Sequence, residues 1–272
     1  MSCNLQRQYI ADTVKNVFAG KKSVKPVAII TYGVTGSGKG NCLSSYLHNH
    51  GSENHNTYEK DSFVEINIDN LVESLDDYRT LVKKSRNNLE KTDAYFECRK
   101  QVDSLSSLLF QKAIAEKMNV IYETTGNNVD WLRGDLVKLR ESGYVIVVVY
   151  PFVTWTVLNK RLDQREKNSE RKIDRKNLAI GFKNAMDNFT KVLPFVDFAY
   201  IYNNNIDGAK YMEPIFEYDG TITHNKKNFV FSCAAKLPQV SDDGELAEHV
   251  KNFLKKICFG DLEITNKFAK KK

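Results

Sequence analysis

The stretch that most constrains this chain is residues 26–50, which read PVAIITYGVTGSGKGNCLSSYLHNH. Residues 27–31 form an apolar, β-branched run that is typical of a buried strand, and apolar residues at helical spacing follow Lys39. Between them lies the glycine-rich segment 33–39, so strand, loop and helix follow in the order that a phosphate-binding loop requires. Glycines let backbone N–H groups surround a phosphate, the helix N-terminus adds partial positive charge, and Lys39 can reach the β- and γ-phosphates.

This pattern predicts a nucleotide-binding loop that departs from the usual motif at one position. The predicted nucleotide-binding residues are Gly33, Thr35, Gly36, Ser37, Gly38, Lys39, Gly40 and Asn41. The motif normally has Ser or Thr directly after the lysine as a Mg²⁺ ligand, and this chain has Gly40 there. Phosphate binding does not need that hydroxyl, but full metal binding does. A glycine-rich turn without function is the simplest alternative, and it would leave the strand, lysine and helix unexplained.

Composition sets the size and class of the fold. With 272 residues, 42% of them hydrophobic, the chain can form one α/β domain or a core with a smaller appendage. The formal net charge of +6 is modest, and the basic tail at residues 267–272 only weakly indicates nucleic-acid binding. The most apolar run, residues 145–149, is too short to cross a bilayer. We therefore expect no membrane association.

The cysteine pattern suggests a reducing environment. The five cysteines are Cys3, Cys42, Cys98, Cys233 and Cys258. Their number is odd, they are widely spread, and no CxxC pair occurs, so we expect neither a disulfide framework nor a zinc site. A cytoplasmic, reducing compartment fits this pattern best.

Apolar strand-like runs alternate with helical patterns along the first 205 residues. Strands are expected at 27–31, 63–68, 119–123, 144–150 and 198–202. Helices are expected at 4–19, 92–118, 130–142, 153–167 and 176–193. The apolar stripe of the second of these helices would comprise Phe96, Val102, Leu105, Leu108, Leu109 and Ile114. This alternation predicts an α/β fold of the P-loop type, with a five-stranded, mostly parallel sheet flanked by helices.

The regular alternation of strand and helix patterns ends after residue 205. Residues 218–220 (Tyr-Asp-Gly) indicate a turn, 229–231 indicate a strand, and 243–257 have amphipathic helical spacing. We therefore expect a core over residues 1–205, with an N-terminal helix, and a C-terminal extension over 206–272 that packs on it.

Two acidic residues are expected at the carboxyl ends of strands, where ligands bind in open α/β sheets. Asp69 follows the second predicted strand and Glu123 ends the third. Phosphoryl transfer needs a carboxylate that orients and deprotonates the acceptor hydroxyl. Asp69 taken alone would more readily be a helix cap, but beside a phosphate-binding loop it becomes a candidate base. Glu123 is the candidate acidic group near Mg²⁺.

A basic segment follows the fourth predicted strand. Its arginines are Arg161, Arg165, Arg171 and Arg175. Guanidinium groups that close over transferring phosphates stabilise the charge of the transition state. The alternative is a solvated basic helix that pairs with the acidic residues among it.

The motifs Gly36-Ser37-Gly38-Lys39, 66–70 (INIDN) and 123–126 (ETTG) resemble those of the zeta-toxin group of P-loop kinases over about residues 25–205. In that group, the chemically best understood members phosphorylate a UDP-amino-sugar from ATP or GTP. The resemblance implies Lys39 as phosphate ligand, Asp69 as catalytic base, and Glu123 with Thr125 on the substrate side. It also implies Arg165 and Arg175 as catalytic lid arginines, with Arg161 and Arg171 as register alternatives.

Two positions depart from the group's pattern. Gly40 replaces the metal-binding hydroxyl, and residues 75–76 (Leu-Asp) stand where a His-Pro pair often follows the base. The resulting expectation is an enzyme that uses ATP or GTP with Mg²⁺ to phosphorylate a small-molecule hydroxyl, with a nucleotide-sugar or nucleotide favoured. A polynucleotide 5′-hydroxyl kinase and a nucleotide-binding regulatory module are the alternatives. An antitoxin-like protein partner is left open.

Overall fold

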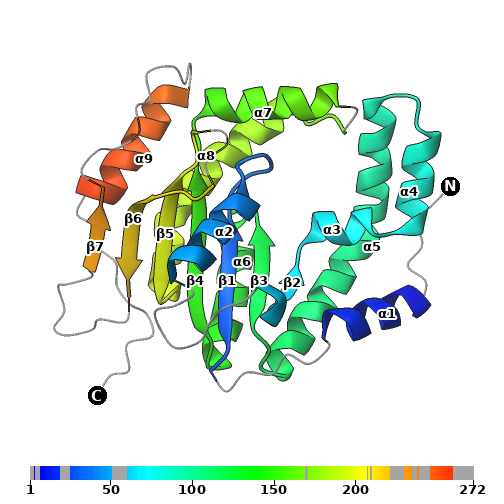
Figure 1. The fold of residues 1–272 in the computed structure, drawn as a ribbon, viewed down its shortest axis with the longest axis horizontal. Helices are drawn as coiled ribbons and strands as arrows, with labels where there is room; N and C mark the ends of the chain where they lie inside the picture. Colours follow the sequence, from blue (N-terminus) through cyan, green and yellow to red (C-terminus); the bar gives the residue numbers. More distant parts are fainter. Residues whose placement is uncertain are drawn as a thin grey trace.

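The structure is a computed structural model that describes residues 3, 7–18, 25–50, 60–168, 171–206, 208, 210–220, 230–234, 238 and 246–259. Seven strands of these residues form one sheet in the spatial order β2-β3-β1-β4-β5-β6-β7 (Figure 1). Their bounds are β1 (Val27–Tyr32), β2 (Val64–Ile66), β3 (Val120–Thr124), β4 (Val145–Phe152), β5 (Phe198–Asn203), β6 (Pro214–Asp219) and β7 (Val230–Cys233).

The first five strands run parallel, and this brings their carboxyl ends to one edge of the sheet. All six residues of β1 are buried, as are seven of the eight in β4. Central parallel strands are covered on both faces, which explains their nearly continuous apolar sequences. β6 and β7 add to the β5 edge in antiparallel orientation.

Helices cover both faces of the sheet (Figure 1). Their bounds are α1 (Arg7–Val17), α2 (Lys39–His50), α3 (Ile68–Glu73), α4 (Asp76–Lys84), α5 (Asn88–Ala115), α6 (Val129–Glu141), α7 (Trp155–Lys167), α8 (Arg175–Val192) and α9 (Ala247–Phe259). Short 3₁₀ helices lie at Lys60–Ser62 and Leu193–Phe195. In Figure 1, α7 crosses near the carboxyl ends of the strands, while α3, α4 and α5 stand at the β2 side.

Two clusters of buried side chains fill the two faces. The larger one contains Ile30 and Val148 and packs against α5, α6, α8 and α9. The smaller one contains Ile29 and Val149 and packs against Cys42 and other residues of α2. Successive strand residues point to opposite faces, so each central strand contributes to both clusters. The fold is therefore a three-layer α/β sandwich, as expected.

Helix α5 begins earlier than the sequence suggested, and its buried face includes only part of the predicted apolar stripe. The side chain of Asn87 accepts hydrogen bonds from the N–H groups of Leu89 and Glu90, at 2.9 and 3.0 Å, and caps the helix one turn before the predicted start. Phe96 and Leu108 of the expected apolar stripe are 55% and 45% exposed. The buried side chains of α5 include Tyr95, Cys98, Val102, Leu105 and Leu109.

The fold class and the five predicted parallel strands are confirmed, but the strand count is wrong. The predicted turn at 218–220 includes the end of β6, where Tyr218 is buried and pairs with Ala199 of β5. Acidic residues alternate with apolar ones in β6, and its strand character depends on pairing with β5 and β7. Within the predicted strand 229–231, residues 230 and 231 lie in β7, while residue 229 lies outside the described residues. The division between residues 205 and 206 stays a prediction.

Two disulfides contradict the expectation of none. Cys3–Cys98 joins the N-terminal segment to α5, and Cys233–Cys258 joins β7 to α9. The partners lie 95 and 25 residues apart, so no local spacing could indicate the pairing. The cytoplasmic location stays a prediction. Across the described part of the chain, no helix combines the length and apolar character that a bilayer span needs.

Candidate active site

The loop between β1 and α2 has the backbone conformation of a phosphate-binding loop. Gly33, Gly36 and Gly38 have φ angles of +136°, +83° and +89°, which side-chain-bearing residues rarely adopt. A Cβ at Gly38 would also lie 2.0 Å from the side-chain nitrogen of Asn204. Helix α2 begins at Lys39, so its partial positive charge lies next to the loop.

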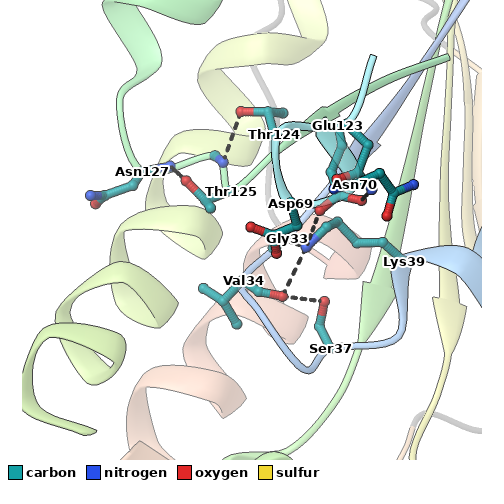
Figure 2. Close-up of polar contacts among 12 residues, drawn as sticks. Gly33, Val34, Ser37, Lys39, Asp69, Asn70, Glu123, Thr124, Thr125 and Asn127 are labelled. Atoms are coloured by element: carbon teal, nitrogen blue, oxygen red, sulfur yellow. Dashed lines mark hydrogen bonds and ion pairs between the residues drawn. The ribbon is translucent and has the colours of Figure 1, made fainter. Parts of the chain in front are cut away.

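Lys39 is held beneath this loop, with only 8% of its surface exposed. Its Nζ donates to the carbonyl oxygens of Gly33 and Val34, at 2.9 and 3.2 Å (Figure 2). It also lies 3.2 Å from Oε1 of Glu123, with which it forms an ion pair. The ammonium group is thus fixed between the ends of β1 and β3, and its charge is balanced by a carboxylate.

Asn67 connects Glu123 to the helix that carries Asp69. The Asn67 side chain donates to Oε2 of Glu123 at 2.8 Å. Its Oδ1 accepts a hydrogen bond from the backbone N–H of Asn70 at 3.1 Å, which makes Asn67 the N-cap of α3. The alternative interpretation of Asp69 as a helix cap is therefore wrong, because Asp69 lies in the first turn. The second strand also ends at Ile66, earlier than predicted.

Asp69 forms a compact cluster with two groups from distant parts of the chain. Tyr95 donates its hydroxyl hydrogen to Oδ1, and Arg171 Nη2 donates to Oδ2 at 3.0 Å. The guanidinium carbon of Arg171 lies 3.6 Å from the centre of the Tyr95 ring. The carboxylate is thereby held through both of its oxygens.

The surroundings of Asp69 favour its charged form. Burial alone would raise the pKa of Asp69, but Arg171, the hydrogen bond from Tyr95 and the charge of Lys39 together lower it. Burial, assisted by the charge of Asp69, raises the pKa of Tyr95 to about 12. Tyr95 therefore keeps its proton at neutral pH and acts as the donor.

A cavity of about 760 Å³ opens beside this cluster. The predicted site residues that line it are Thr35, Asp69, Glu123, Thr125 and Arg171. Four aromatic residues also line it: Tyr95, Phe96, Tyr122 and Trp131. Its volume and mixed polar and aromatic walls suit a small organic ligand.

The predicted lid arginines occupy different environments. Of the four, only Arg171 lines the cavity. Arg175 Nη2 pairs with two carboxylates of α7, at 2.8 and 3.2 Å, and Arg161 Nη2 donates to the backbone oxygen of Asn204 at 2.8 Å. Arg165 lies in the last turn of α7. Catalytic roles for Arg165 and Arg175 stay predictions.

Three polar residues of the site were not identified from the sequence: Asn67, Tyr95 and Asn204. Asn67 stood directly before the predicted base region and has a residue type that favours N-caps, so its capping role could have been found. Tyr95 and Asn204 give no comparable local indication, because their partners are 26 and 167 residues away in sequence.

The side chains suit Mg²⁺ only as an ion held mainly by nucleotide phosphates. Gly40 offers no hydroxyl, and Glu123 already contacts Lys39 and Asn67. Among the described residues, no group of three or more His, Cys, Asp or Glu side chains is arranged to hold a metal. Mg²⁺ commonly keeps several waters and takes one or two carboxylates together with substrate phosphates. Glu123 as a metal ligand stays a prediction.

Comparisons with known proteins agree with the fold described above. The sequence profile of the family described as Zeta toxin matches residues 12–209. A structure from the PezAT chromosomal toxin–antitoxin system of the human pathogen Streptococcus pneumoniae aligns with a TM-score of 0.59 and 15% identity, covering 93% of this chain and 98% of that one. The native AvrRxo1-ORF1:-ORF2 complex aligns with a TM-score of 0.55 and 11% identity, covering 92% and 79%. A comparison with curated protein sequences finds no match.

At these identities the two structures show a shared fold, whereas the family match is made by the sequence itself. The matched range spans the phosphate-binding loop, Asp69, Glu123 and the arginine segment. Zeta toxins are P-loop kinases, so the match supports nucleotide-dependent kinase chemistry in general terms. The resemblance seen in the sequence is confirmed, and the chain belongs to the Zeta toxin family.

Proposed function

We propose that the protein transfers the γ-phosphoryl group of ATP or GTP to a hydroxyl group of a small molecule. The observation that carries this proposal is the common location of Lys39 and Asp69. Lys39 lies within the phosphate-binding loop, and Asp69 lines the adjoining cavity close enough for the lysine charge to act on it. A triphosphate on the loop would present its terminal phosphate to the cavity in which the acceptor would bind.

In this proposal Asp69 orients the acceptor hydroxyl and takes up its proton. Its lowered pKa keeps it ionised at neutral pH but makes it a weak base. A weak base suffices if the transition state is loose, because the hydroxyl then loses its proton late. Arg171 lies next to Asp69 and would stabilise charge on the transferring group, while Arg161, Arg165 and Arg175 are proposed as lid residues.

The cavity wall supports a nucleotide-sugar or a nucleotide as the acceptor. Phe96 and Trp131 expose aromatic surface there, which suits a planar ring. Arg99 and Lys172 line the same cavity and would bind phosphate oxygens. Thr125, which directly follows β3 and lines the cavity, is proposed as a further substrate contact.

Mg²⁺ would be held by the nucleotide phosphates with help from Glu123, and would neutralise phosphate charge there. An antitoxin-like protein is proposed as a partner. Support comes from the Streptococcus pneumoniae neighbour, which belongs to a toxin–antitoxin system, and from the family match.

Transfer of labelled γ-phosphate to a panel of acceptors tests the proposal directly. The panel should contain nucleotide-sugars, nucleotides, simple sugars and a 5′-hydroxyl oligonucleotide. We expect labelled product from a small molecule in the first two groups. Transfer to the oligonucleotide alone would instead support a polynucleotide kinase, and transfer to none would contradict the proposal.

Two variants show whether the transfer depends on the predicted site. Lys39→Met keeps most of the buried stem but removes the charge, so nucleotide binding and transfer should both fall sharply. Asp69→Asn should leave nucleotide affinity nearly unchanged and lower kcat by about 10²–10⁴-fold, the usual worth of a general base. Thermal unfolding of both variants controls for loss of structure. Normal transfer by either variant would contradict the role assigned to that residue.

The Asp69 cluster predicts a change in titration when its arginine is removed. The pKa of Asp69 lies below its ordinary value of 3.8, and Arg171 is the strongest of the groups that lower it. Without that cation, the desolvation of the carboxyl is opposed less, so Arg171→Ala should raise the pKa. A ¹³C NMR titration of the side-chain carboxyl measures this, with Asp69→Asn to identify the resonance.

Arg99→Ala provides the matched control for this titration. Arg99 lines the same cavity, but its ion pair is with Asp103, at 3.8 Å, and not with Asp69. It should leave the Asp69 titration close to that of the wild type. An unchanged titration in Arg171→Ala would contradict the ion pair on which the assigned charge state depends.

A second candidate function, a regulatory module that binds nucleotide without catalysis, is favoured by one observation. The residue after the loop lysine is Gly40, which cannot supply the usual Mg²⁺ ligand. A Cβ at Gly40 would meet no atom within 4 Å, so a serine fits there without displacing a neighbour.

Gly40→Ser separates the two candidates. If the protein is an enzyme with weakened metal affinity, the substitution should lower the Mg²⁺ concentration needed for half-maximal transfer. Gly40→Ala controls for the helix-stabilising effect of any Cβ in the first turn. Transfer by Gly40→Ser with none by the wild type would support the regulatory module. Coincident metal titrations of wild type and Gly40→Ser would contradict a metal role for this position.

A further inference from the structure

Asn204 is a buried polar residue that follows β5, and its side chain contacts the phosphate-binding loop at Ser37 and Gly38. Its side chain is almost fully enclosed, with 3% of the residue exposed. The side-chain nitrogen Nδ2 donates to the backbone oxygen of Ser37 at 2.6 Å, across 167 residues of sequence. Buried side-chain amides need hydrogen-bond partners, and this one has its partner in the nucleotide-binding loop.

The contact fixes the direction of one peptide group of the loop. In a trans peptide, the carbonyl oxygen and the following N–H point in opposite directions. Because the oxygen of Ser37 is held toward Asn204, the N–H of Gly38 is directed away from Asn204. Loop N–H groups are what such a loop offers to phosphate oxygens, so their direction decides how well it binds.

Gly38 has two reasons to be glycine at this contact. Its φ of +89° disfavours any side chain, and a Cβ there would lie 2.0 Å from Asn204 Nδ2. Asn204 therefore lies against the backbone of Gly38 as well as bonding to Ser37. The close packing and the hydrogen bond restrain the same pair of loop residues.

Asn204 is itself anchored through its backbone. Its N–H donates to the oxygen of Phe152 at 2.8 Å, which ties it to the end of β4. Its carbonyl oxygen accepts a hydrogen bond from Arg161 Nη2 at 2.8 Å, which ties it to α7. The loop is thus braced against two strand ends and a helix through a single residue.

We propose that Asn204 is a positioning residue that holds the Ser37–Gly38 peptide in its phosphate-binding orientation. Arg161 then contributes through Asn204, in addition to any contact of its own. The inference rests on the proposed binding of a nucleoside triphosphate at this loop, and it concerns the phosphate part of that ligand alone.

The test compares ligand affinities of Asn204→Ala with those of the wild type by isothermal titration calorimetry. ATP and inorganic tripolyphosphate are the two probes, because the second lacks base and ribose. Loss of a buried hydrogen bond should lower the affinities for ATP and for tripolyphosphate by a similar factor, about tenfold. A lower affinity for ATP with an unchanged affinity for tripolyphosphate would mean that Asn204 recognises the nucleoside. That result would overturn the proposal.

Asn205→Ala is the matched control. The Asn205 side chain accepts a hydrogen bond from the backbone N–H of Thr154 at 2.7 Å and donates one to Oδ1 of Asn203 at 2.8 Å. The substitution therefore also removes a side-chain-to-backbone bond from the same segment, together with one bond between side chains. It should lower the melting temperature comparably and leave both affinities unchanged. Equal weakening in Asn205→Ala would overturn the proposal, since the effect would then come from the segment as a whole.

Two further measurements distinguish a failure of this inference from misfolding of the variant and from a failure of the proposed function. Asn204→Ser keeps a short hydroxyl donor, and partial recovery of affinity relative to Asn204→Ala is expected. Wild-type protein that binds neither probe would overturn the proposed nucleotide binding and the inference with it. Wild-type binding with unchanged affinity in a folded Asn204→Ala would overturn the inference alone.

Discussion

The structure depends on how one buried cation is held at the end of the sheet. Lys39 places its ammonium group among two loop carbonyls and the Glu123 carboxylate, with little exposure to solvent. A buried ammonium group without such partners would destabilise the fold. The adjacent strands β1 and β3 must therefore end together, because one supplies the loop and the other supplies the counter-charge. Asn67 extends this arrangement to α3 and so to Asp69.

The second constraint is the convergence of distant segments on the Asp69 carboxylate. Helix α5 brings Tyr95 and the segment before α8 brings Arg171, so the charge of Asp69 is set by elements that do not neighbour it in sequence. The same elements line the adjoining cavity, which couples the position of the carboxylate to the shape of the acceptor site. Arginine at this position also gives the cavity wall a permanent cation.

The sequence was sufficient where local patterns decide the structure. The β1 strand, the loop and the start of α2 follow from adjacent residue types, and the apolar run of β4 follows from burial on both faces. Tertiary contacts decided the rest. The buried face of α5 includes Tyr95 because its hydroxyl has a carboxylate partner, while the more apolar Phe96 stays exposed. Strand β6 depends on two antiparallel neighbours, and the disulfides and Asn204 depend on partners too distant for any spacing rule.

The central claim is that Lys39 and its loop bind the triphosphate beside Asp69. A crystal structure with a non-hydrolysable ATP analogue tests it most directly. The account predicts phosphates along residues 33–39, with Nζ of Lys39 in contact with them and the terminal phosphate facing the cavity that Asp69 lines. An analogue bound elsewhere, or one whose phosphates make no contact with Lys39, would contradict the account.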